Sequence, residues 1–179
     1  MAGIRVATEA DAEAIAAMLA PYVTETAISF EETPPTPAET AAKMAAILEL
    51  YPYLVFDDGK NLLGYAYGSQ HRPRPAYRWS VETTVYVDGS AHRQGIGRAL
   101  YAELLELLTR QGFHSAFAGI VLPNEKSVGL HEAMGFRYIG TFSDIGFKFG
   151  EFQHLGWWQR TLSPDRPVRN PISFQSFAT

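Results

Sequence analysis

The chain has 179 residues, of which 46% are hydrophobic, and its 15 Lys and Arg against 19 Asp and Glu give a formal charge of -4. This balance fits one globular domain and excludes a disordered chain. A weakly acidic chain without a basic run argues against nucleic acid as the main partner. The absence of cysteine excludes disulfides, thiolate metal sites and a cysteine nucleophile. No apolar stretch is long enough to cross a membrane and no signal peptide is evident, so we expect a cytoplasmic protein without a membrane partner.

The first third of the chain predicts a strand, a helix, a loop and a second helix. The strand is expected at residues 4–7, and Thr8 is placed to cap a helix that runs to about residue 22. Residues 23–36 have no helical or strand pattern and form a loop. Thr36 and Glu39 have the spacing of a capping box, which predicts that a second helix begins there.

The later segments predict six more strands and two more helices. The strands are expected at 53–56, 62–69, 79–87, 116–121, 137–142 and 153–161. The helices are expected at 96–110 and 124–134, where Gly112 and Gly135 end them. Without an internal repeat or a linker, these patterns predict one α+β domain over residues 1–162. The tail over residues 163–179 is either an arm or partly disordered.

A glycine-containing turn joins the strand at 79–87 to the next helix. Gly95 and Gly97 let backbone amides approach a ligand closely, because no Cβ stands in the way. The first turn of a helix adds unpaired N–H groups and the positive end of the helix dipole. With Arg93 and Arg98, this arrangement suits a diphosphate. The alternative is an ordinary strand–helix connection whose glycines serve only the turn. The spacing matches neither a P-loop nor a dinucleotide-binding motif.

Two segments in this order resemble the GCN5-related N-acetyltransferase (GNAT) family. VYVDGSAHRQGIGRAL resembles its acetyl-CoA-binding motif, with His92 where Gln or Arg is usual, and LPNEKSVGLHEAMGF resembles its second conserved segment. VETTVYV, GFKFG and GWWQ extend the resemblance to the phosphinothricin N-acetyltransferase-like branch and carry it to about Leu162. His154 departs from that branch, which often has an acidic residue at this position.

The resemblance implies a GNAT fold, in which helices flank a central, mostly antiparallel mixed sheet. Two parallel strands, here 79–87 and 116–121, splay apart in this fold, and the pantetheine arm of acetyl-CoA lies in the gap. Backbone groups of Val85 and Val87 are expected to bond the pantetheine and the acetyl carbonyl, and amides from Gln94 to Ala99 the diphosphate. The full set of implied acetyl-CoA-binding residues is Val85, Tyr86, Val87, Arg93, Gln94, Gly95, Ile96, Gly97, Arg98, Ala99, Asn124 and Ser127.

Acetyl transfer to an amine benefits from a general base, because most amines are protonated at neutral pH. Glu82 lies on the strand that leads into the acetyl-CoA motif, and carboxylates are seldom found on central strands unless they are paired or functional. A salt bridge to Arg74 or Arg78 is the structural alternative. The resemblance favours Glu82 as the base, acting directly or through a water. It also offers His131 as the acid that protonates the leaving thiolate, although a packing role for this histidine stays open.

A loop before the strand at 79–87 carries Arg72, Arg74 and Tyr77, and its two prolines restrict it. Arginine and tyrosine side chains bind carboxylate or phosphinate oxygens, and the resemblance places them at the acidic end of the acceptor. A solvated basic loop is the alternative. Phe30 and Glu31 in the early loop are expected to line the same pocket. We therefore expect transfer from acetyl-CoA to a small anionic amino acid, such as phosphinothricin, methionine sulfone or methionine sulfoximine, by direct attack in a ternary complex.

Two other functional classes remain open. One is an enzyme that acetylates protein N-termini or ribosomal proteins, and the other is a non-enzymatic acyl-CoA-binding module. The branch commonly forms homodimers, and Trp157 and Trp158 are either part of such an interface or part of the core. The histidines lack the spacing of a metal site, so we expect no metal.

Overall fold

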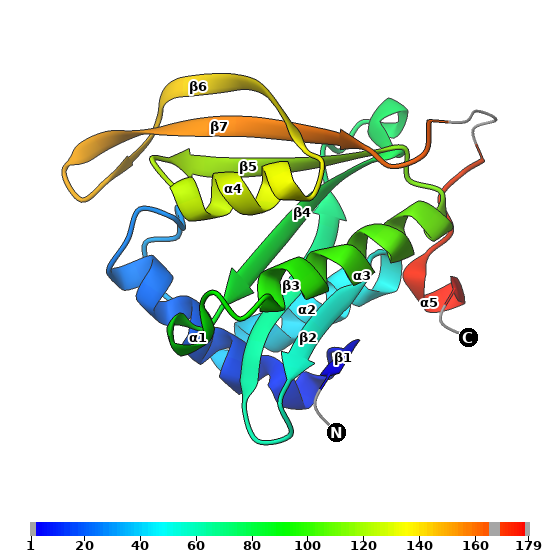
Figure 1. Cartoon of the computed structure of the whole chain (residues 1–179). Helices are drawn as coiled ribbons and strands as arrows, with labels where there is room; N and C mark the ends of the chain where they lie inside the picture. The colour runs from blue at the N-terminus through cyan, green and yellow to red at the C-terminus, as the bar shows by residue number, and fades with distance from the viewer. Residues whose placement is uncertain (1–2, 165–168, 178–179) are drawn as a thin grey trace.

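The computed structural model describes residues 3–164 and 169–177, and in it one seven-stranded sheet is flanked by helices (Figure 1). The strands are β1 (Gly3–Val6), β2 (Tyr53–Asp57), β3 (Leu62–Gln70), β4 (Ser80–Val87), β5 (Ser115–Leu122), β6 (Arg137–Lys148) and β7 (Glu151–Thr161). The helices are α1 (Ala12–Thr24), α2 (Pro37–Leu50), α3 (Ile96–Gln111), α4 (Glu125–Ala133) and α5 (Phe174–Phe177). No helix in these two described ranges is long and apolar enough to cross a membrane.

The order of the sheet is β1-β2-β3-β4-β5-β7-β6. Neighbouring strands are antiparallel except for β4 and β5, which run parallel. These two strands pair only where Ser80–Glu82 faces Ser115–Phe117, and beyond that point they diverge (Figure 1). The mostly antiparallel mixed sheet and the splayed parallel pair expected from the sequence are therefore confirmed.

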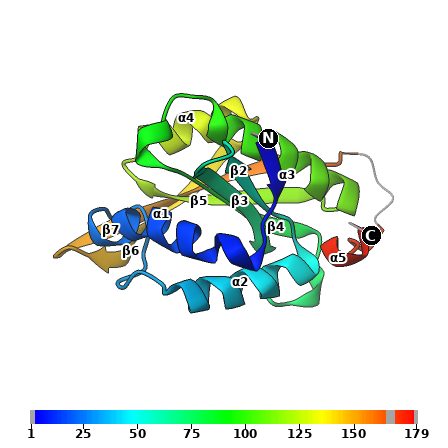
Figure 2. The same cartoon turned by 90° about the horizontal axis from the view of Figure 1, so that it is seen from below.

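The two faces of the sheet carry separate hydrophobic cores. α1 and α2 pack on one face, where the core includes Ile15, Met44 and Tyr65, and Figure 2 shows these helices together below the sheet. α3 packs on the other face, where the core includes Leu104 and its neighbours. β4 lies between the two cores, and successive side chains of a strand point to opposite faces. Its residues therefore face both sides of the molecule.

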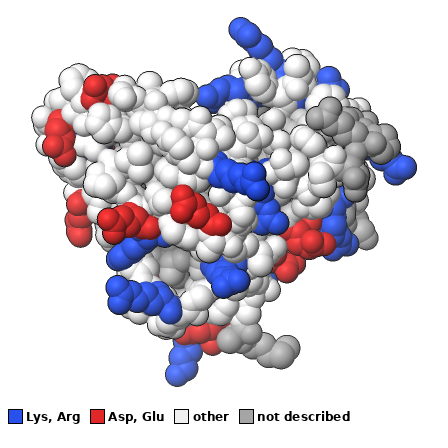
Figure 3. Space-filling model, turned by 45° about the horizontal axis from the view of Figure 1, so that its top comes forward, with Lys and Arg blue, Asp and Glu red and all other residues white. Residues whose placement is uncertain are grey.

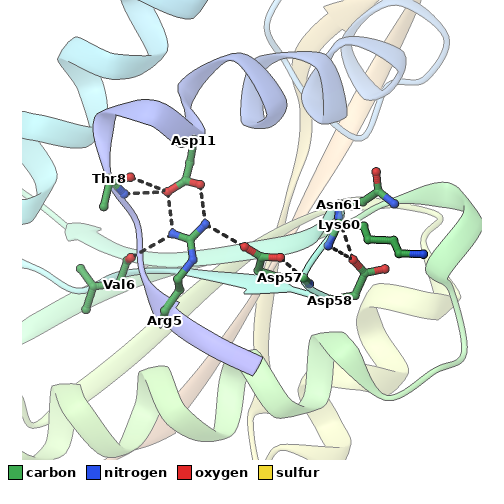
Figure 4. A network of polar contacts seen from close by, with 9 residues as sticks. Arg5, Val6, Thr8, Asp11, Asp57, Asp58, Lys60 and Asn61 are labelled. Atoms are coloured by element: carbon green, nitrogen blue, oxygen red, sulfur yellow. Dashed lines mark hydrogen bonds and ion pairs between the residues drawn. The ribbon is translucent and has the colours of Figure 1, made fainter. Parts of the chain in front are cut away.

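A network of polar contacts fixes the N-terminal segment (Figure 4). The Arg5 guanidinium bonds the Asp11 carboxylate at 2.7 and 2.8 Å and reaches Asp57 at the end of β2 at 3.1 Å. This pairing lowers the pKa of Asp11, whose carboxylate also accepts the backbone N–H of Thr8 at 2.7 Å. The turn after Thr8 is a short 3-10 helix before α1. The expected capping box at Thr36 is confirmed as well.

Strands β6 and β7 are longer than the sequence pattern predicts. They form one hairpin that turns at Phe149 and Gly150, both of which have positive φ. The sequence pattern predicted strands only at 137–142 and 153–161, because large apolar side chains of β6 are exposed. The burial alternation that marks a half-buried strand is therefore missing.

The described part of the tail packs on the body of the protein. Phe174 is 4% exposed, and the Gln111 side chain at the end of α3 donates to the Ile172 carbonyl at 2.7 Å. The Trp79 indole N–H donates to the Arg169 carbonyl at 2.8 Å. Residues 169–177 thus lie against the end of α3 and the start of β4, while residues 165–168 lie outside the described ranges.

Candidate active site

A cavity of about 570 Å³ opens in the gap between β4 and β5. Of the expected acetyl-CoA-binding residues, all except Gln94 and Ala99 line it. The sequence-based grouping also missed several lining residues, among them Tyr22 and Ile28 at the end of α1 and after it, Tyr101 of α3, and Gly119–Val121 of β5. The gap therefore gathers segments from the N-terminal helix to α4 into one groove.

The turn before α3 has the backbone conformation that an anion site requires. Gly95 is the N-cap in the left-handed region at φ 79, and Arg93, at φ 65, adopts the same region although it is not glycine. The first-turn amides of α3, from Ile96 to Arg98, have no partner within the helix. The amide of Ala99 differs, because it donates to the Gly95 carbonyl at 2.9 Å. The expectation that Ala99 binds the diphosphate therefore needs correction.

Gln94, the first residue of the expected diphosphate site, does not line the groove. Its side-chain amide donates to the Ser90 carbonyl at 3.4 Å across the turn. At Gly97, an added Cβ would lie 3.2 Å from Leu130 and 3.4 Å from Val87, which leaves little room for a side chain. The turn therefore offers the groove backbone N–H groups and the side chains of Arg93 and Arg98.

The edge of β4 that faces the gap carries free backbone groups. The Asp88 N–H donates to the Leu63 carbonyl of β3, so in this antiparallel pair the backbone groups of Val85 and Val87 point toward β5. Because β5 has diverged there, these groups face the groove. The Val87 carbonyl is already occupied by the Tyr22 hydroxyl at 2.7 Å, which also contacts His92 Nε2 at 3.2 Å.

A buried hydrogen-bonded cluster closes one side of the groove. Asn124 caps α4 by accepting the Ser127 N–H at 3.1 Å, and one turn later His131 is only 4% exposed. Its Nδ1 lies 2.7 Å from the Ser127 carbonyl, and its Nε2 lies 2.6 Å from the Tyr101 hydroxyl. The same hydroxyl is 3.3 Å from Thr83 Oγ1.

These contacts assign the protons of the cluster. Because a carbonyl oxygen only accepts hydrogen bonds, Nδ1 of His131 carries the hydrogen that faces Ser127. Burial lowers the pKa of this imidazole, so the ring is neutral at pH 7. Its Nε2 is then an acceptor for the Tyr101 hydroxyl, whose own pKa is raised by burial. Both ring nitrogens of His131 are therefore engaged inside the cluster, and the neutral imidazole has no N–H directed at a thiolate in the groove. The geometry thus argues against the acid role that the resemblance implies for His131.

A second cavity, of about 440 Å³, lies on the opposite face of β4. It shares Thr84 and Tyr86 with the groove, so a ligand on either side reaches the same two residues of β4. Glu31 lines it, together with Lys43 of α2, which the sequence analysis missed. Arg72, Arg74, Tyr77 and Glu82, with which Glu31 was expected to share a pocket, do not line this cavity. Its remaining polar lining comes from tyrosines of β2 and β3 and from side chains of α2 and the α1–α2 loop, namely Tyr53, Tyr65, Tyr67, Ser29, Thr33, Glu39 and Thr40.

The loop that covers this second cavity is held by a buried lysine. Lys148 at the end of β6 is 8% exposed, and its ammonium donates to the carbonyls of Val23, Ser29 and Glu31 at 2.8, 2.6 and 2.8 Å. The Phe30 ring lies against the backbone of Gly146, where an added Cβ would come within 2.7 Å of it. Phe30 therefore packs on β6 and does not line the cavity, which corrects its expected place.

Glu82 lies on the face of β4 that bears Thr84 and Tyr86, because the three residues alternate along the strand. Its Oε1 is 2.9 Å from Nδ1 of His71 and 3.6 Å from the Arg72 guanidinium. The carboxylate is thus paired, as the structural alternative required, but with His71 and Arg72 in place of Arg74 or Arg78. His71, just after β3, was not singled out from the sequence.

The basic loop divides its three expected acceptor-binding residues between two places. Arg72 lies beside Glu82 and over the Trp157 ring, and the Tyr77 ring meets the edge of His71. Arg74 is exposed, and together with parts of Arg72 and Tyr77 it lines a cavity of about 240 Å³ formed with tail residues 170–173. The structure therefore brings Arg72 and Tyr77 to the surroundings of Glu82, while the Arg74 side chain lines the neighbouring cavity beside the tail.

Within residues 3–164 and 169–177, no three His, Asp or Glu side chains are grouped so as to hold a metal ion.

The matching family model is described as the acetyltransferase (GNAT) domain and covers residues 4–157. A phosphinothricin N-acetyltransferase of Streptomyces viridochromogenes is 40% identical over 93% of this chain and 92% of its own. An L-methionine sulfoximine/L-methionine sulfone acetyltransferase of Pseudomonas paraeruginosa is 36% identical over 92% of this chain and 97% of its own.

The solved structures give the same relationship. A phosphinothricin acetyltransferase from Sinorhizobium meliloti, in complex with acetyl-CoA, superposes with a TM-score of 0.89 at 35% identity over 97% of this chain and 96% of its own. The similarity spans the splayed strands, the glycine turn and α4, which form the groove. The chain is therefore an acetyltransferase and belongs to the GNAT family, among its phosphinothricin N-acetyltransferase-like members.

Proposed function

We propose that this protein moves the acetyl group of acetyl-CoA to the amine of a small, anionic, amino-acid-like acceptor by direct attack in a ternary complex. One observation carries the proposal. The groove and the second cavity lie on opposite faces of β4 and share Thr84 and Tyr86. A donor in one and an acceptor in the other can therefore meet at β4 while both are bound, and no covalent acetyl-enzyme is needed.

The groove is suited to acetyl-CoA. The first turn of α3 offers unpaired amides to the diphosphate, and Arg93 and Arg98 add positive charge there. The free backbone groups of Val85 then face the pantetheine and the acetyl carbonyl, whose oxygen gains negative charge during attack. A donor that is bound through backbone groups is placed accurately, because these groups are fixed by the sheet. Since acetyl-CoA is present in the cytoplasm, this reaction also fits a cytoplasmic protein.

On the acceptor side, Glu82 is the proposed base. It lies on the face of β4 from which the acceptor approaches, and its contacts to His71 and Arg72 are made through Oε1. Its Oε2 is left to take a proton from the ammonium group, after which the amine nitrogen attacks the thioester carbon. The carbon–sulfur bond then breaks, and the departing thiolate takes the second proton that the nitrogen loses as the amide forms. Arg72 and Tyr77 bind the acidic end of the acceptor, and Arg74, farther along the loop, contributes less.

The test is an acceptor screen with acetyl-CoA, read out as free thiol. Phosphinothricin, methionine sulfone, methionine sulfoximine and ordinary amino acids are compared with peptides that carry a free N-terminus and with neutral amines. Thiol release that depends on an anionic amino acid supports the proposal. Activity confined to peptides would favour a protein N-terminal or ribosomal protein acetyltransferase, and acetyl-CoA binding without any transfer would favour a binding module.

We further propose a homodimer that forms through β6. Trp158 belongs to the core at 4% exposure, so it does not supply an interface as the sequence allowed. Edge strand β6 and the hairpin instead expose Tyr138, Ile139, Phe142, Ile145, Phe147, Phe149 and Phe152, each about half exposed or more. Figure 3, with this side turned forward, shows a broad area without charged side chains. Such a surface favours a second copy of the chain, and light scattering that finds a monomer at micromolar concentration would contradict the dimer.

A further inference from the structure

The second cavity, on the α2 side of the sheet, contains a positive charge that no described carboxylate neutralises. Lys43 of α2 lines this cavity, and its ammonium lies 5.4 Å from the centre of the Tyr67 ring, which lines it too. Contact with the ring face holds the end of this flexible side chain beside the cavity. Among the described residues, Lys43 forms no ion pair, and it is the only positively charged side chain in the lining. The cavity therefore offers an ammonium group to a ligand.

A buried hydroxyl without a partner lies three residues before Lys43 on the same helix. Thr40 lines the same cavity and is 6% exposed, and its Oγ1 has no hydrogen-bond partner in the part of the chain that the structure describes. Residues three apart lie on the same face of a helix. Because buried hydroxyls are normally paired, an unpaired one beside a cavity favours a ligand atom as its partner.

The strands contribute neutral hydroxyl groups to the cavity. Tyr53 of β2, Tyr65 of β3 and Tyr86 of β4 line it, and burial raises the pKa of all three phenols. They therefore carry no negative charge at neutral pH that would repel an anion. A neutral phenol can donate a hydrogen bond to an anionic oxygen, as the Thr40 hydroxyl can.

Two carboxylates also line the cavity, and both are compatible with an anionic ligand at Lys43. The carboxylate of Glu39 is engaged by the backbone N–H and the hydroxyl of Thr36, at 2.8 and 2.9 Å, in the cap of α2. Glu31 is exposed on the α1–α2 loop and forms no ion pair with Lys43 in the described structure. Opposite charges that are not paired with each other suit a ligand that carries both signs, as an amino acid does.

Resting on the proposed function, we infer that Lys43 and Thr40 bind a second acidic group of the acceptor, so that the preferred substrates are amino acids with an acidic side chain. Arg72 binds the first acidic group beside Glu82. Thr84, which lines the cavity, lies two residues or about 7 Å along β4 from Glu82 and on the same face. One small molecule can therefore reach both places. Lys43 is a specificity-determining residue that does not contact the reacting amine.

The test compares kcat/KM for matched acceptors. Phosphinothricin and glutamate carry two acidic groups, whereas methionine sulfone and glutamine carry one. Lys43→Met keeps the length of the side chain and removes its charge, and the fold should survive because Lys43 is exposed. We expect kcat/KM to fall by about 10- to 100-fold for acceptors with two acidic groups and by less than about 2-fold for the others. KM for acetyl-CoA should stay unchanged.

Two further variants distinguish recognition from a structural role. Lys43→Glu should invert the preference, so that glutamine is acetylated faster than glutamate. Thr40→Val keeps the shape of the side chain, and it should lower kcat/KM by about 3-fold with the two-acid acceptors alone. Its Tm should not fall, because the hydroxyl that it removes has no partner. Lys60→Met, on the exposed β2–β3 turn, is the control for loss of a positive charge and should behave as wild type.

Equal losses with both classes of acceptor in Lys43→Met, or an unchanged preference in Lys43→Glu, would overturn the inference and leave the proposed function intact. If the wild-type protein releases no thiol with any acceptor, the proposed function fails by itself. Glutarate, a dicarboxylate without an amine, then tests the cavity by calorimetry. It should bind the wild type and bind Lys43→Met at least about 10-fold more weakly. No binding to the wild type, or equal affinity for both proteins, would overturn the inference.

Discussion

The two sides of β4 are built in different ways. The groove that we propose for the donor is formed mainly by one continuous segment, from Thr83 through the glycine turn into Tyr101, with α4 closing it. Its polar contacts are largely backbone groups. The second cavity, on the proposed acceptor side, is lined by side chains of α1, α2, β2, β3 and β4 and of the α1–α2 loop. That loop is held by Lys148 of the hairpin, and the basic loop meets Glu82 beside the cavity. Binding through backbone groups of neighbouring residues is largely preserved when side chains are substituted. Binding through side chains from distant segments changes whenever one of those side chains is substituted.

Under this proposal, we expect the acceptor to differ between relatives more readily than the donor. Backbone amides at a helix N-terminus bind the same diphosphate whatever the neighbouring side chains are. On the acceptor side, a single replacement in the basic loop or at Lys43 changes the charge that the acceptor meets. We expect substitutions in the groove to weaken acetyl-CoA binding only when they add bulk or charge beside the backbone amides. We expect substitutions on the acceptor side to weaken acceptor binding when they remove a charged or polar side chain.

The largest effect is expected from Gly97→Glu, which tests the donor side. A side chain here has little space beside Leu130 and Val87, and its carboxylate would repel the diphosphate. Binding of acetyl-CoA should be lost in calorimetry while circular dichroism shows the native fold. Gly129→Glu is the control, because this α4 glycine has open space around it. Unchanged affinity in folded Gly97→Glu would place the diphosphate elsewhere.

The next largest effect is expected from Glu82→Gln, which tests the acceptor side. The amide keeps the shape of the side chain but cannot take a proton. The rate at neutral pH should fall by about 100-fold or more, as is usual when a general base is removed. The loss should shrink as pH rises, because the amine then loses its proton unaided. A small loss that is the same at every pH would give Glu82 a structural role.

Arg72→Ala separates the two arginines of the basic loop. Because Arg72 lies beside Glu82, its loss should raise KM for an anionic acceptor by about 10- to 100-fold, the equivalent of one charge-assisted bond. Arg74→Ala should have a smaller effect. KM for acetyl-CoA should be unchanged in both variants, and a neutral amine should respond to neither. An equal loss with acidic and neutral acceptors would show that the loop acts by holding the structure.

Lys148→Met tests whether the covering loop needs its anchor. Three carbonyls lose a charged donor, and leaving such buried groups without a partner costs about 1–3 kcal/mol of unfolding free energy. The loop over residues 25–35 should become more sensitive to proteases, and KM for the acceptor should rise several-fold with little change in KM for acetyl-CoA. Lys60→Met, on the exposed β2–β3 turn, provides the control. Equal changes in both KM values would mean that the anchor serves the whole fold.

The smallest effect concerns the pH dependence of stability. Burial lowers the pKa of His131, so between that lowered value and the ordinary value near 6.5 the unfolded state binds more protons than the folded state. This contribution to stability is therefore fully present above about pH 6.5 and declines as pH falls below it. Denaturant unfolding should show wild type losing more stability between pH 7.5 and 5.5 than His131→Gln. The same loss in both would mean that His131 is not the group responsible.

Most features around the groove could be predicted from the sequence, and the predictions that need correction have simple physical causes. The caps and the glycine turn follow from residues close together in the chain, and the splayed strands were implied by the resemblance to the GNAT family. Ala99 was misplaced because a helical hydrogen bond uses its amide. The proton assignment at His131 required its two partners, Ser127 and Tyr101, the second of which lies 30 residues away. A residue type alone does not show whether its proton is already engaged.

By itself, the sequence determined the order of strands and helices, the glycine turn before a helix and the place of a carboxylate on the strand that leads into it. These features depend on periodicity, capping and glycine conformation, which are local properties of the chain, whereas the mixed sheet was implied by the resemblance to the GNAT family. Only the tertiary structure decided that His71 contacts Glu82, that Lys148 holds the loop beside the second cavity, and that Arg72 in place of Arg74 pairs with Glu82. Such contacts join segments up to 125 residues apart, and their geometry is set by how the two faces of the sheet are packed.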